Sequence, residues 1–428
     1  MSNYEILRPN DRPNLGRWIP LSFQHVFAMF GATILVPLLT GLNPETALFT
    51  AGTGTLIYIL CTGAKVPAFL GSSFAFIPPL IAISAGYGVP AALGGAVAAG
   101  IFYCLVALII RFTGTGWLDK ALPPVVIGSV IVVIGLNLAP VAMDMVMNDA
   151  DGYSLVYLSI AAITLIVTVI ANIFLKGFFN TIPILIGLVT GYLFTLIMGF
   201  IFPAYAIINF QIIKDAAWFS FPSFRVPSFN FVPVLTFIIV SLATICEHLG
   251  DTLVTSKVVG QDFYKNPGLH RTLTGDGLAT AWAALWGGPP NTTYGENIGV
   301  MAITRVYSVW VIGGAAVIAV FLSFFNKFSA IIKTIPSPVL GGISMLLFGI
   351  IASSGLRTIV DNGVDYKDKR NLTITSVILV IGIGGGRLAF NITRDLHFEL
   401  AGVAFATVIG IILNLVFPQA KKDSNKVT

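Results

Sequence analysis

The sequence predicts an all-α integral membrane protein with about fourteen transmembrane segments, arranged as a 7+7 inverted repeat. Three observations lead to this prediction. Long apolar stretches recur throughout the 428 residues, and only 10% of the residues are charged, whereas a soluble protein carries about 25%. Lys and Arg are unequally distributed between alternate loops. Short motifs recur in the same order in the two halves of the chain.

The apolar stretches define the individual segments, because a helix needs roughly 20 residues to cross the hydrocarbon core. The segments are expected at 20–41, 45–62, 66–85, 90–112, 121–142, 153–174, 178–201, 232–256, 270–288, 291–304, 307–325, 335–353, 371–386 and 398–418. The third and the tenth are poor helices. Their sequences, "VPAFLGSSFAFIPPL" and "GGPPNTTYGENIGV", contain prolines, glycines and short polar residues.

The basic residues indicate how the segments cross the membrane. If the N-terminus lies in the cytoplasm, 18 of the 24 Lys and Arg residues fall on the cytoplasmic side, including Lys257 and Arg357, and 6 fall outside, including Arg387. Cytoplasmic loops carry such an excess. The pattern therefore predicts a multi-pass protein with both termini in the cytoplasm. We expect no removable signal peptide, and we attribute the net charge of +5 to topology rather than to nucleic-acid binding.

Internal similarity supports the repeat. The pairs are "QH" at 24 with "EH" at 247, "GSSFAF" at 71 with "NTTYGE" at 291, and "PVVIGSVIVVIGL" at 124 with "PVLGGISMLLFGI" at 338. Chance similarity between apolar helices is the alternative. With seven segments in each half, the second half enters the membrane in the opposite sense.

The two poor helices occupy the third position in each half. Interrupted segments at matched positions indicate a binding site near the middle of the membrane. We expect "SSF" and "TTY" to form short antiparallel strands that pair with each other. Half-helices would follow, and the amides at their starts could donate hydrogen bonds to a ligand.

Four acids fall within predicted segments: Glu247, Asp251, Asp276 and Glu296. An ionisable residue in the membrane is costly and suggests a function. Glu247 and Asp251 are four residues apart and share a helix face. Repulsion between two nearby carboxylates in a low dielectric favours protonation of one of them, which suits a group that carries a proton. For each acid the alternative is a structural role, and we expect Asp276 to cap a helix near the cytoplasmic end.

Histidines and aromatic residues near these acids are further candidates. His25 and His248 could relay a proton or hold neighbouring helices together by hydrogen bonds. Phe74 and Tyr294 occupy equivalent places on the interrupted segments, and a flat heterocycle would fit between their faces. Phe348 lies on a repeated element, where packing is the alternative.

Several classes of protein are disfavoured. The chain lacks the sequence motifs of hydrolases and nucleotide-binding enzymes. We therefore expect that the protein is not an enzyme and that it binds no cofactor or metal. An intramembrane hydrolase would need a GxGD-type element, and Asp276 lies in "TGDG" instead. An anion carrier would need a cation beside the interrupted segments, and the nearest, Arg305, follows the half-helix. Two unlike acids at one interrupted site also suit a site that encloses its substrate better than the ring of polar groups that lines a channel pore.

The stretch "ENIGVMAITR" (Glu296 to Arg305) resembles the signature of the nucleobase–ascorbate transporter family, and "SFQHVFAMFGATILVP", "GSSFAF" and "EHLGD" resemble other motifs of that family. The resemblance covers nearly the whole chain. It is greatest to the bacterial uracil permeases, which have Glu at position 296 where many purine carriers have Gln.

The resemblance implies uracil import by proton symport in the bacterial cell membrane, with H⁺ as the coupling ion. It implies a core domain (1–114 and 231–326; spans one to four and eight to eleven). It also implies a gate domain (115–230 and 327–428; spans five to seven and twelve to fourteen), whose helices could support a homodimer. A purine permease of the same fold is the main alternative.

The resemblance also implies roles for individual residues. Uracil would be bound by Glu247 and Glu296 with the backbone of Phe74 and Gly295, in a pocket lined by Ala32, Tyr294 and Phe348. Proton coupling would involve Glu247, Asp251 and His25. Some uracil permeases have His in place of Asp251 and Tyr in place of Phe348. The first difference leaves the proton path open, and the second removes a hydroxyl from the gate side.

Overall fold

The computed structural model describes residues 6–393 and 396–418, and most of this part is helical. In it, seven stretches of helix are long and apolar enough to cross a membrane: α1, α4, α6 with α7, α8, α9, α11 and α16. Shorter apolar helices lie at Phe74–Tyr87, Val309–Ser323 and Gly402–Val416. The predicted helical, multi-pass membrane class is confirmed.

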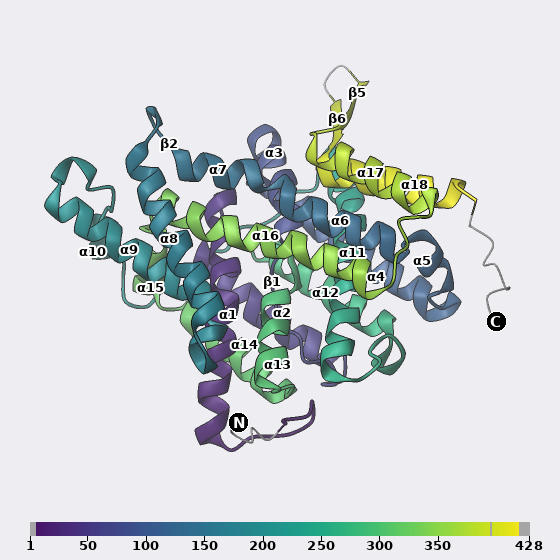
Figure 1. Cartoon of the computed structure of the whole chain (residues 1–428), viewed down its shortest axis with the longest axis horizontal. Coiled ribbons are helices and arrows are strands. Elements are labelled where there is room, and N and C mark those ends of the chain that lie inside the picture. The colour runs from purple at the N-terminus through teal and green to yellow at the C-terminus, as the bar shows by residue number, and fades with distance from the viewer. Residues whose placement is uncertain (1–5, 394–395, 419–428) are drawn as a thin grey trace.

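The helices and strands are labelled in chain order in Figure 1. The first half contains α1 (Leu15–Thr40), α2 (Pro44–Cys61), β1 (Leu70–Ser72), α3 (Ile77–Tyr87), α4 (Val89–Thr113), α5 (Gly116–Ala121), α6 (Pro124–Asn137), α7 (Ala139–Met147), β2 (Asn148–Asp149), β3 (Gly152–Tyr153), α8 (Leu155–Phe174), α9 (Pro183–Ile201) and α10 (Gln211–Asp215). The second half contains α11 (Phe231–Val259), α12 (Leu269–Leu285), β4 (Asn291–Thr293), α13 (Gly295–Thr304), α14 (Val309–Ser323), α15 (Asn326–Lys333), α16 (Ser337–Asp361), α17 (Lys369–Ile383), β5 (Arg387–Thr393), β6 (Leu396–Ala401) and α18 (Gly402–Val416).

Local sequence explains where several helices begin and end. The side chain of Asn14 caps the start of α1 by accepting a hydrogen bond from the Arg17 amide. Gly41 ends α1 in the left-handed conformation, which glycine adopts without strain. The predicted fifth segment is divided between α6 and α7 at Leu138, because Pro140 has no amide hydrogen to continue the ladder of α6.

The interrupted segments meet in the interior of the molecule. β1 pairs with β4 in antiparallel register, so that Leu70 lies opposite Thr293 and Ser72 opposite Asn291. Every residue of the two strands is buried. The pairing satisfies backbone groups that could not stay unbonded in the membrane. A short 3-10 turn and α3 follow β1, and α13 follows β4.

The helices pack in two groups. In the first, α12 packs against α2 and α4, α14 packs against α1 and α2, and α11 packs against α4. In the second, α16 packs against α6 and α8, α17 packs against α6 and α18, and α8 packs against α9. Figure 1 shows α6 and α16 of the second group side by side.

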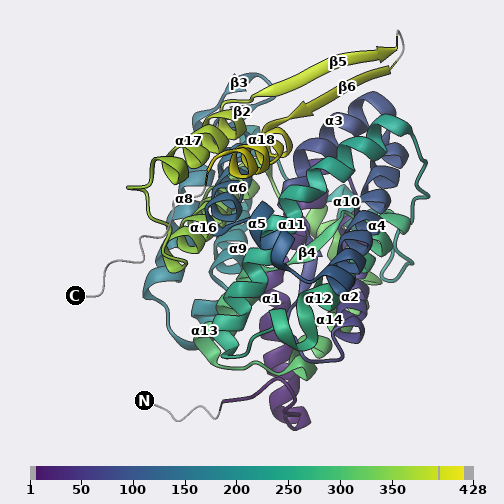
Figure 2. The same ribbon diagram turned by 90° about the vertical axis from the view of Figure 1, so that its right-hand side faces the viewer.

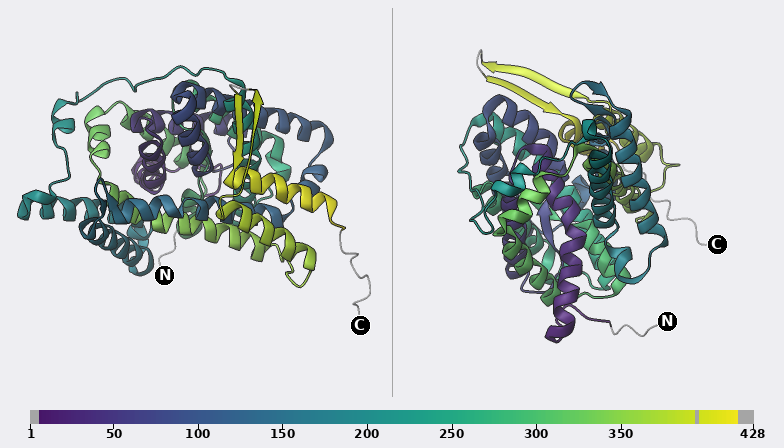
Figure 3. Two further views of the ribbon diagram at one scale, coloured as in Figure 1. Left: turned by 90° about the horizontal axis from the view of Figure 1, so that it is seen from above. Right: turned by 90° about the vertical axis from the view of Figure 1, so that its left-hand side faces the viewer.

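Two irregular features lie at the periphery of the molecule. The β5–β6 hairpin projects from the end opposite to the start of α1 (Figure 2). The long connection from α10 to α11 runs along one edge of the molecule (Figure 3, left). Backbone hydrogen bonds join this connection to the first helix group, from the Ser228 amide to the Pro90 carbonyl and from the Arg225 amide to the Trp286 carbonyl.

Close approach between α4 and α12 depends on glycine, as in many membrane helix pairs. A Cβ atom built on Gly100 would lie 2.5 Å from the backbone nitrogen of Ala281 and 2.5 Å from the carbonyl oxygen of Gly277. Neither backbone atom can move without displacing a helix.

We therefore expect Gly100→Ala to lower the free energy of unfolding by about 1–3 kcal/mol, the usual cost of overpacking. Denaturant unfolding of the detergent-solubilised protein would measure the loss. Gly116→Ala is the matched control, because a Cβ atom at Gly116 meets nothing within 4 Å. Equal stability of the two variants would contradict the packing argument.

Candidate functional site

A cavity of about 330 Å³ lies beside the paired strands β1 and β4, which we call the strand crossing, and between α11, α13 and α16. Its lining comprises Phe74, Ile131, Glu247, Asp251, Val254, Val258, Thr292, Thr293, Tyr294, Gly295, Glu296, Ile298, Gly299, Ala302, Ile350, Ile351, Ser353, Ser354 and Arg357. Most of these side chains are apolar or small, and the few polar groups are concentrated around the crossing, as in many small-molecule sites.

The start of α13 supplies backbone donors to this cavity. Tyr294 precedes the helix, and no side chain caps it. The first amides of a helix have no partner within it, and the helix dipole adds partial positive charge there. Gly295 and Gly299 both line the cavity, and a Cβ atom on either would meet nothing within 4 Å. The backbone is therefore open to a ligand.

Three carboxylates line the same cavity: Glu247 and Asp251 from α11, and Glu296 from the first turn of α13. The strand crossing orients the two acids of α11. Ser73 Oγ donates to Glu247 Oε2 at 3.4 Å, and Thr293 Oγ1 donates to Asp251 Oδ2 at 2.9 Å. Each carboxylate therefore depends on a different strand end for its position.

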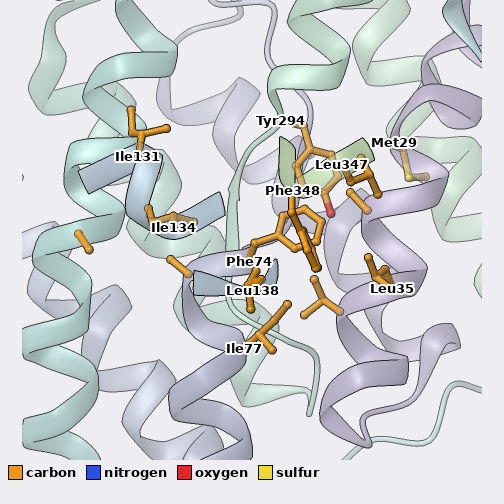
Figure 4. Packing of buried hydrophobic residues seen from close by; sticks show 14 of the residues in the cluster. Met29, Leu35, Phe74, Ile77, Ile131, Ile134, Leu138, Tyr294, Leu347 and Phe348 are labelled. Carbon is orange, nitrogen blue, oxygen red and sulfur yellow. The ribbon is translucent and has the colours of Figure 1, made fainter. Parts of the chain in front are cut away.

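Aromatic side chains close one side of the cavity. The Tyr294 hydroxyl donates to the Ser72 carbonyl at 3.3 Å and accepts from Thr33 Oγ1 at 3.1 Å. The rings of Phe74 and Phe348 meet edge to face with their centroids 5.7 Å apart. Figure 4 shows these three rings together. Tyr294 and Phe74 line the cavity, while Phe348 supports Phe74 from α16.

The structure thus brings six of the predicted site residues to one cavity: Glu247, Asp251, Glu296, Phe74, Tyr294 and Gly295. Three others do not line it. Ala32 and Phe348 are buried in the apolar core. His25 is also buried. Its Nδ1 lies 3.1 Å from Asn297 Nδ2, which also donates to the His25 carbonyl at 3.1 Å. His25 therefore joins α1 to α13 directly behind Glu296.

Asp276 is not the helix cap that the sequence suggested. α12 begins at Leu269, directly after Gly268, and Asp276 lies two turns inside the helix. The Oδ2 atom of Asp276 is 3.0 Å from His248 Nδ1, and both side chains are fully buried. His248 Nε2 also lies 3.1 Å from Thr272 Oγ1. His248 and Asp276 therefore connect α11 to α12 behind Glu247.

Sequence reasoning missed the wall formed by α16. Ser353, Ser354 and Arg357 line the cavity from this helix. Their spacing places them on neighbouring turns of α16, and this clustering of polar residues could have been recognised in the sequence. Only the fold shows that this face of α16 meets α13. Gly299 was also missed, although it lies inside the quoted "ENIGV" stretch.

The cavity extends toward the C-terminal ends of α11 and α16. Val254, Val258 and Arg357 line it near the C-terminal ends of α11 and α16. Lys257 and Arg357 belong to the basic residues predicted to lie in the cytoplasm. Arg357 Nε lies 3.4 Å from Asp361 Oδ2. The polar crossing is therefore at one end of a cavity that runs toward the predicted cytoplasmic face.

Comparisons with known proteins cover nearly the whole chain. The sequence model of the permease family matches residues 16–389. The uracil permease of Bacillus subtilis (strain 168) is 54% identical over 424 residues, covering 96% of this chain and 95% of the relative. The uracil permease of Escherichia coli (strain K12) is 46% identical over 414 residues, covering 95% and 93%.

Solved structures share the fold at low sequence identity. The transmembrane domain of the cyanobacterial bicarbonate transporter BicA gives a TM-score of 0.66 at 14% identity, covering 96% of this chain and 100% of that chain. Murine Slc26a9, an anion transporter in the inward-facing state, gives 0.66 at 9% identity, covering 95% and 69%. These likenesses concern the fold alone.

We expect Asp276→Ala to reduce the free energy of unfolding by about 3–5 kcal/mol, because it leaves the buried His248 without its partner. Asp361→Ala removes an exposed partner of Lys257 and Arg357, and should cost less than about 1 kcal/mol. Thermal unfolding in detergent would compare the variants. A loss for Asp276→Ala no larger than the loss for Asp361→Ala would contradict a structural role for the buried pair.

Proposed function

The chain belongs to the nucleobase–ascorbate transporter family, and from this membership we propose that it imports uracil across the bacterial cell membrane by proton symport. The relatives that are named uracil permeases support the substrate. The observation that carries the proposal is that Glu247, Glu296 and the open start of α13 face one cavity.

The chemistry of the cavity matches uracil. The ring offers two N–H donors and two carbonyl acceptors. Carboxylates accept from N–H groups, while backbone amides donate to carbonyls. Glu247 and Glu296 would take the first role, and the backbone at Gly295 and Phe74 the second. The bond to ionised Glu296 would be the stronger, charge-assisted kind, and protonated Glu247 would still accept through its carbonyl oxygen. The faces of Phe74 and Tyr294 would enclose the flat ring.

The same lining argues against an anion carrier, although the solved structures that share the fold transport anions. Among the described residues that line the cavity, the acids are Glu247, Asp251 and Glu296, and the one Lys or Arg is Arg357. Arg357 lies far along α16, beside Asp361. An anion at the strand crossing would meet carboxylates rather than a cation. A purine permease remains the second candidate within the family.

We propose that Glu247 carries the coupled proton. Its protonation from outside would permit uracil to load, and loss of that proton to the cytoplasm would weaken binding and release uracil. Asp251 lies one turn closer to the cytoplasmic end of α11 and would pass the proton on. His25 would act through Asn297, which it holds next to Glu296.

We also propose that the chain forms fourteen segments in two inverted repeats. The packing supports this, because contacts between helices of the two halves occur in matching pairs, in which each helix is replaced by its counterpart from the other half. α12 packs on α4 as α2 packs on α14, and α16 packs on α8 as α6 packs on α17. The core domain would be 1–114 with 231–326, and the gate domain 115–230 with 327–428, with gate helices available for a homodimer. The cavity would then open inward between the two domains.

We expect Glu247→Gln and Glu296→Gln each to reduce uptake of labelled uracil by at least tenfold. Glu296→Gln replaces a charge-assisted hydrogen bond, worth about 1.5–3 kcal/mol, by a neutral one, and Glu247→Gln removes the group proposed to carry the proton. Uptake by cells that lack other uracil carriers would measure the loss, with unlabelled xanthine as a competitor to test the purine alternative.

Glu45→Gln is the matched control for these variants. Glu45 is a buried acid that lies 3.1 Å from Lys333 and does not line the cavity. Gln at this position can still accept a hydrogen bond from the lysine. If uptake by both cavity variants equalled that of Glu45→Gln at matched membrane abundance, the assignment of the binding site would be wrong.

Replacing Asp251 by Asn should separate binding from coupling. We expect Asp251→Asn to lose accumulation of uracil driven by a proton gradient but to retain exchange of labelled for unlabelled uracil. Asn can still accept the hydrogen bond from Thr293, so the crossing should keep its geometry. Proteoliposomes with an imposed pH gradient would measure both activities. Gradient-driven accumulation at the parent level would remove Asp251 from the proton path.

A further inference from the structure

A second cavity, of about 470 Å³, lies on the other side of the strand crossing. Its walls are one face of α3, the first turns of α11, the end of α6, and the junction of β6 with α18. The β5–β6 hairpin projects beside it (Figure 2). Arg387 of this hairpin belongs to the basic residues predicted to lie outside the cell. We call this the outer cavity, and the one lined by the acids the inner cavity. The transport mechanism proposed above does not use the outer cavity.

One helix lines both cavities. Val232, Thr236 and Val240 of α11 face the outer cavity. Further along the same helix, Glu247 and Asp251 face the inner one. The intervals of four and seven residues keep these positions on one helix face. At 1.5 Å per residue, Thr236 lies about 22 Å along the helix from Asp251. The two cavities are therefore successive along a single direction through the molecule.

A thin layer of apolar side chains separates them. Phe74 lines the inner cavity, and its neighbour Ala75 lines the outer one. Around Phe74, the buried side chains of Ile77, Leu138 and Phe348 fill the space between α3, α6 and α16 (Figure 4). The edge-to-face contact of Phe74 with Phe348 lies in this layer. The inner cavity thus reaches Phe74, and the outer cavity reaches the next residue along the chain.

The outer cavity also contains a polar group that lacks a partner. The Thr236 side chain is 8% exposed. Within the described residues, its hydroxyl has no hydrogen-bond partner, although threonines in helices commonly bond to the preceding turn. A buried hydroxyl without a partner costs about 1–3 kcal/mol, and a ligand in the cavity could supply the missing bond. Asn137, at the end of α6, offers an amide to the same space.

We propose that the outer cavity is a second binding site for the substrate, an uncharged planar heterocycle, which it holds before the substrate passes the Phe74–Phe348 contact. This inference rests on the proposed function. Thr236 and Asn137 would bind the polar edge of the ring, and the apolar faces of Pro78 and Ile83 would enclose its body. Fewer polar side chains line the outer cavity than the inner one, so we expect its binding to be the weaker of the two.

The test is whether Thr236→Val changes the KM for uptake from the outer face only. This variant removes the hydroxyl and keeps the shape of the side chain. Loss of one hydrogen bond should raise the KM for uptake into intact cells about fivefold. In inverted membrane vesicles, uracil enters from the cytoplasmic face, and the KM should equal that of the parent. Thr236→Ser keeps a hydroxyl and should restore the parent value in cells.

Thr407→Val is the matched control, because the Thr407 hydroxyl is also buried but donates to the Val403 carbonyl at 2.7 Å. It should not change the ratio of the two KM values. The proposal is overturned if Thr236→Val leaves the KM in cells unchanged, or raises it equally from both faces. If the parent protein itself imports no uracil, the proposed function fails, which is a separate outcome.

Discussion

The antiparallel crossing of β1 and β4 is the constraint on which the site depends. Extended backbone at membrane depth is stable only when its polar groups are bonded and covered by protein. Pairing meets that condition for Leu70–Ser72 and Asn291–Thr293, whose residues are all buried. Helices α3 and α13 begin shortly after these strands, in the interior, so that the start of α13 and two side-chain hydroxyls lie near the carboxylates of α11. A continuous helix would present none of these groups.

The crossing also relates the acids to the rest of the core. Glu247 and Asp251 each accept a hydrogen bond from a residue at a strand end. Behind them, buried polar contacts of His248 and Asp276 hold α11 against α12, and His25 with Asn297 holds α1 against α13. The carboxylates that line the cavity therefore lie directly beside members of the buried polar pairs on α11 and α13. A change in the supporting pairs would alter the orientation of the carboxylates without touching a ligand.

The sequence predicted the features that follow from local composition. Prolines and Gly71 revealed the interrupted segments, and the rarity of charge in apolar stretches revealed the acids that line the cavity. What it could not predict were contacts between distant segments. Nothing near Asp276 shows that it meets His248, and nothing in α16 shows which turn faces α13. Ala32 and Phe348, taken from a resemblance, lie behind the lining because packing of α1 and α16 decides their depth.

Lys327 joins the two chain connections that contain α10 and α15. Lys327 in α15 donates to the carbonyls of Ile213, at 2.6 Å, and Lys214, at 3.1 Å, in α10. The rings of Phe219 and Phe325 lie against each other close by. α10 and α15 belong to the two separate chain connections that link one helix group to the other on this face. Because these contacts join the two connections, a displacement of one helix group relative to the other would either break them or move both connections together.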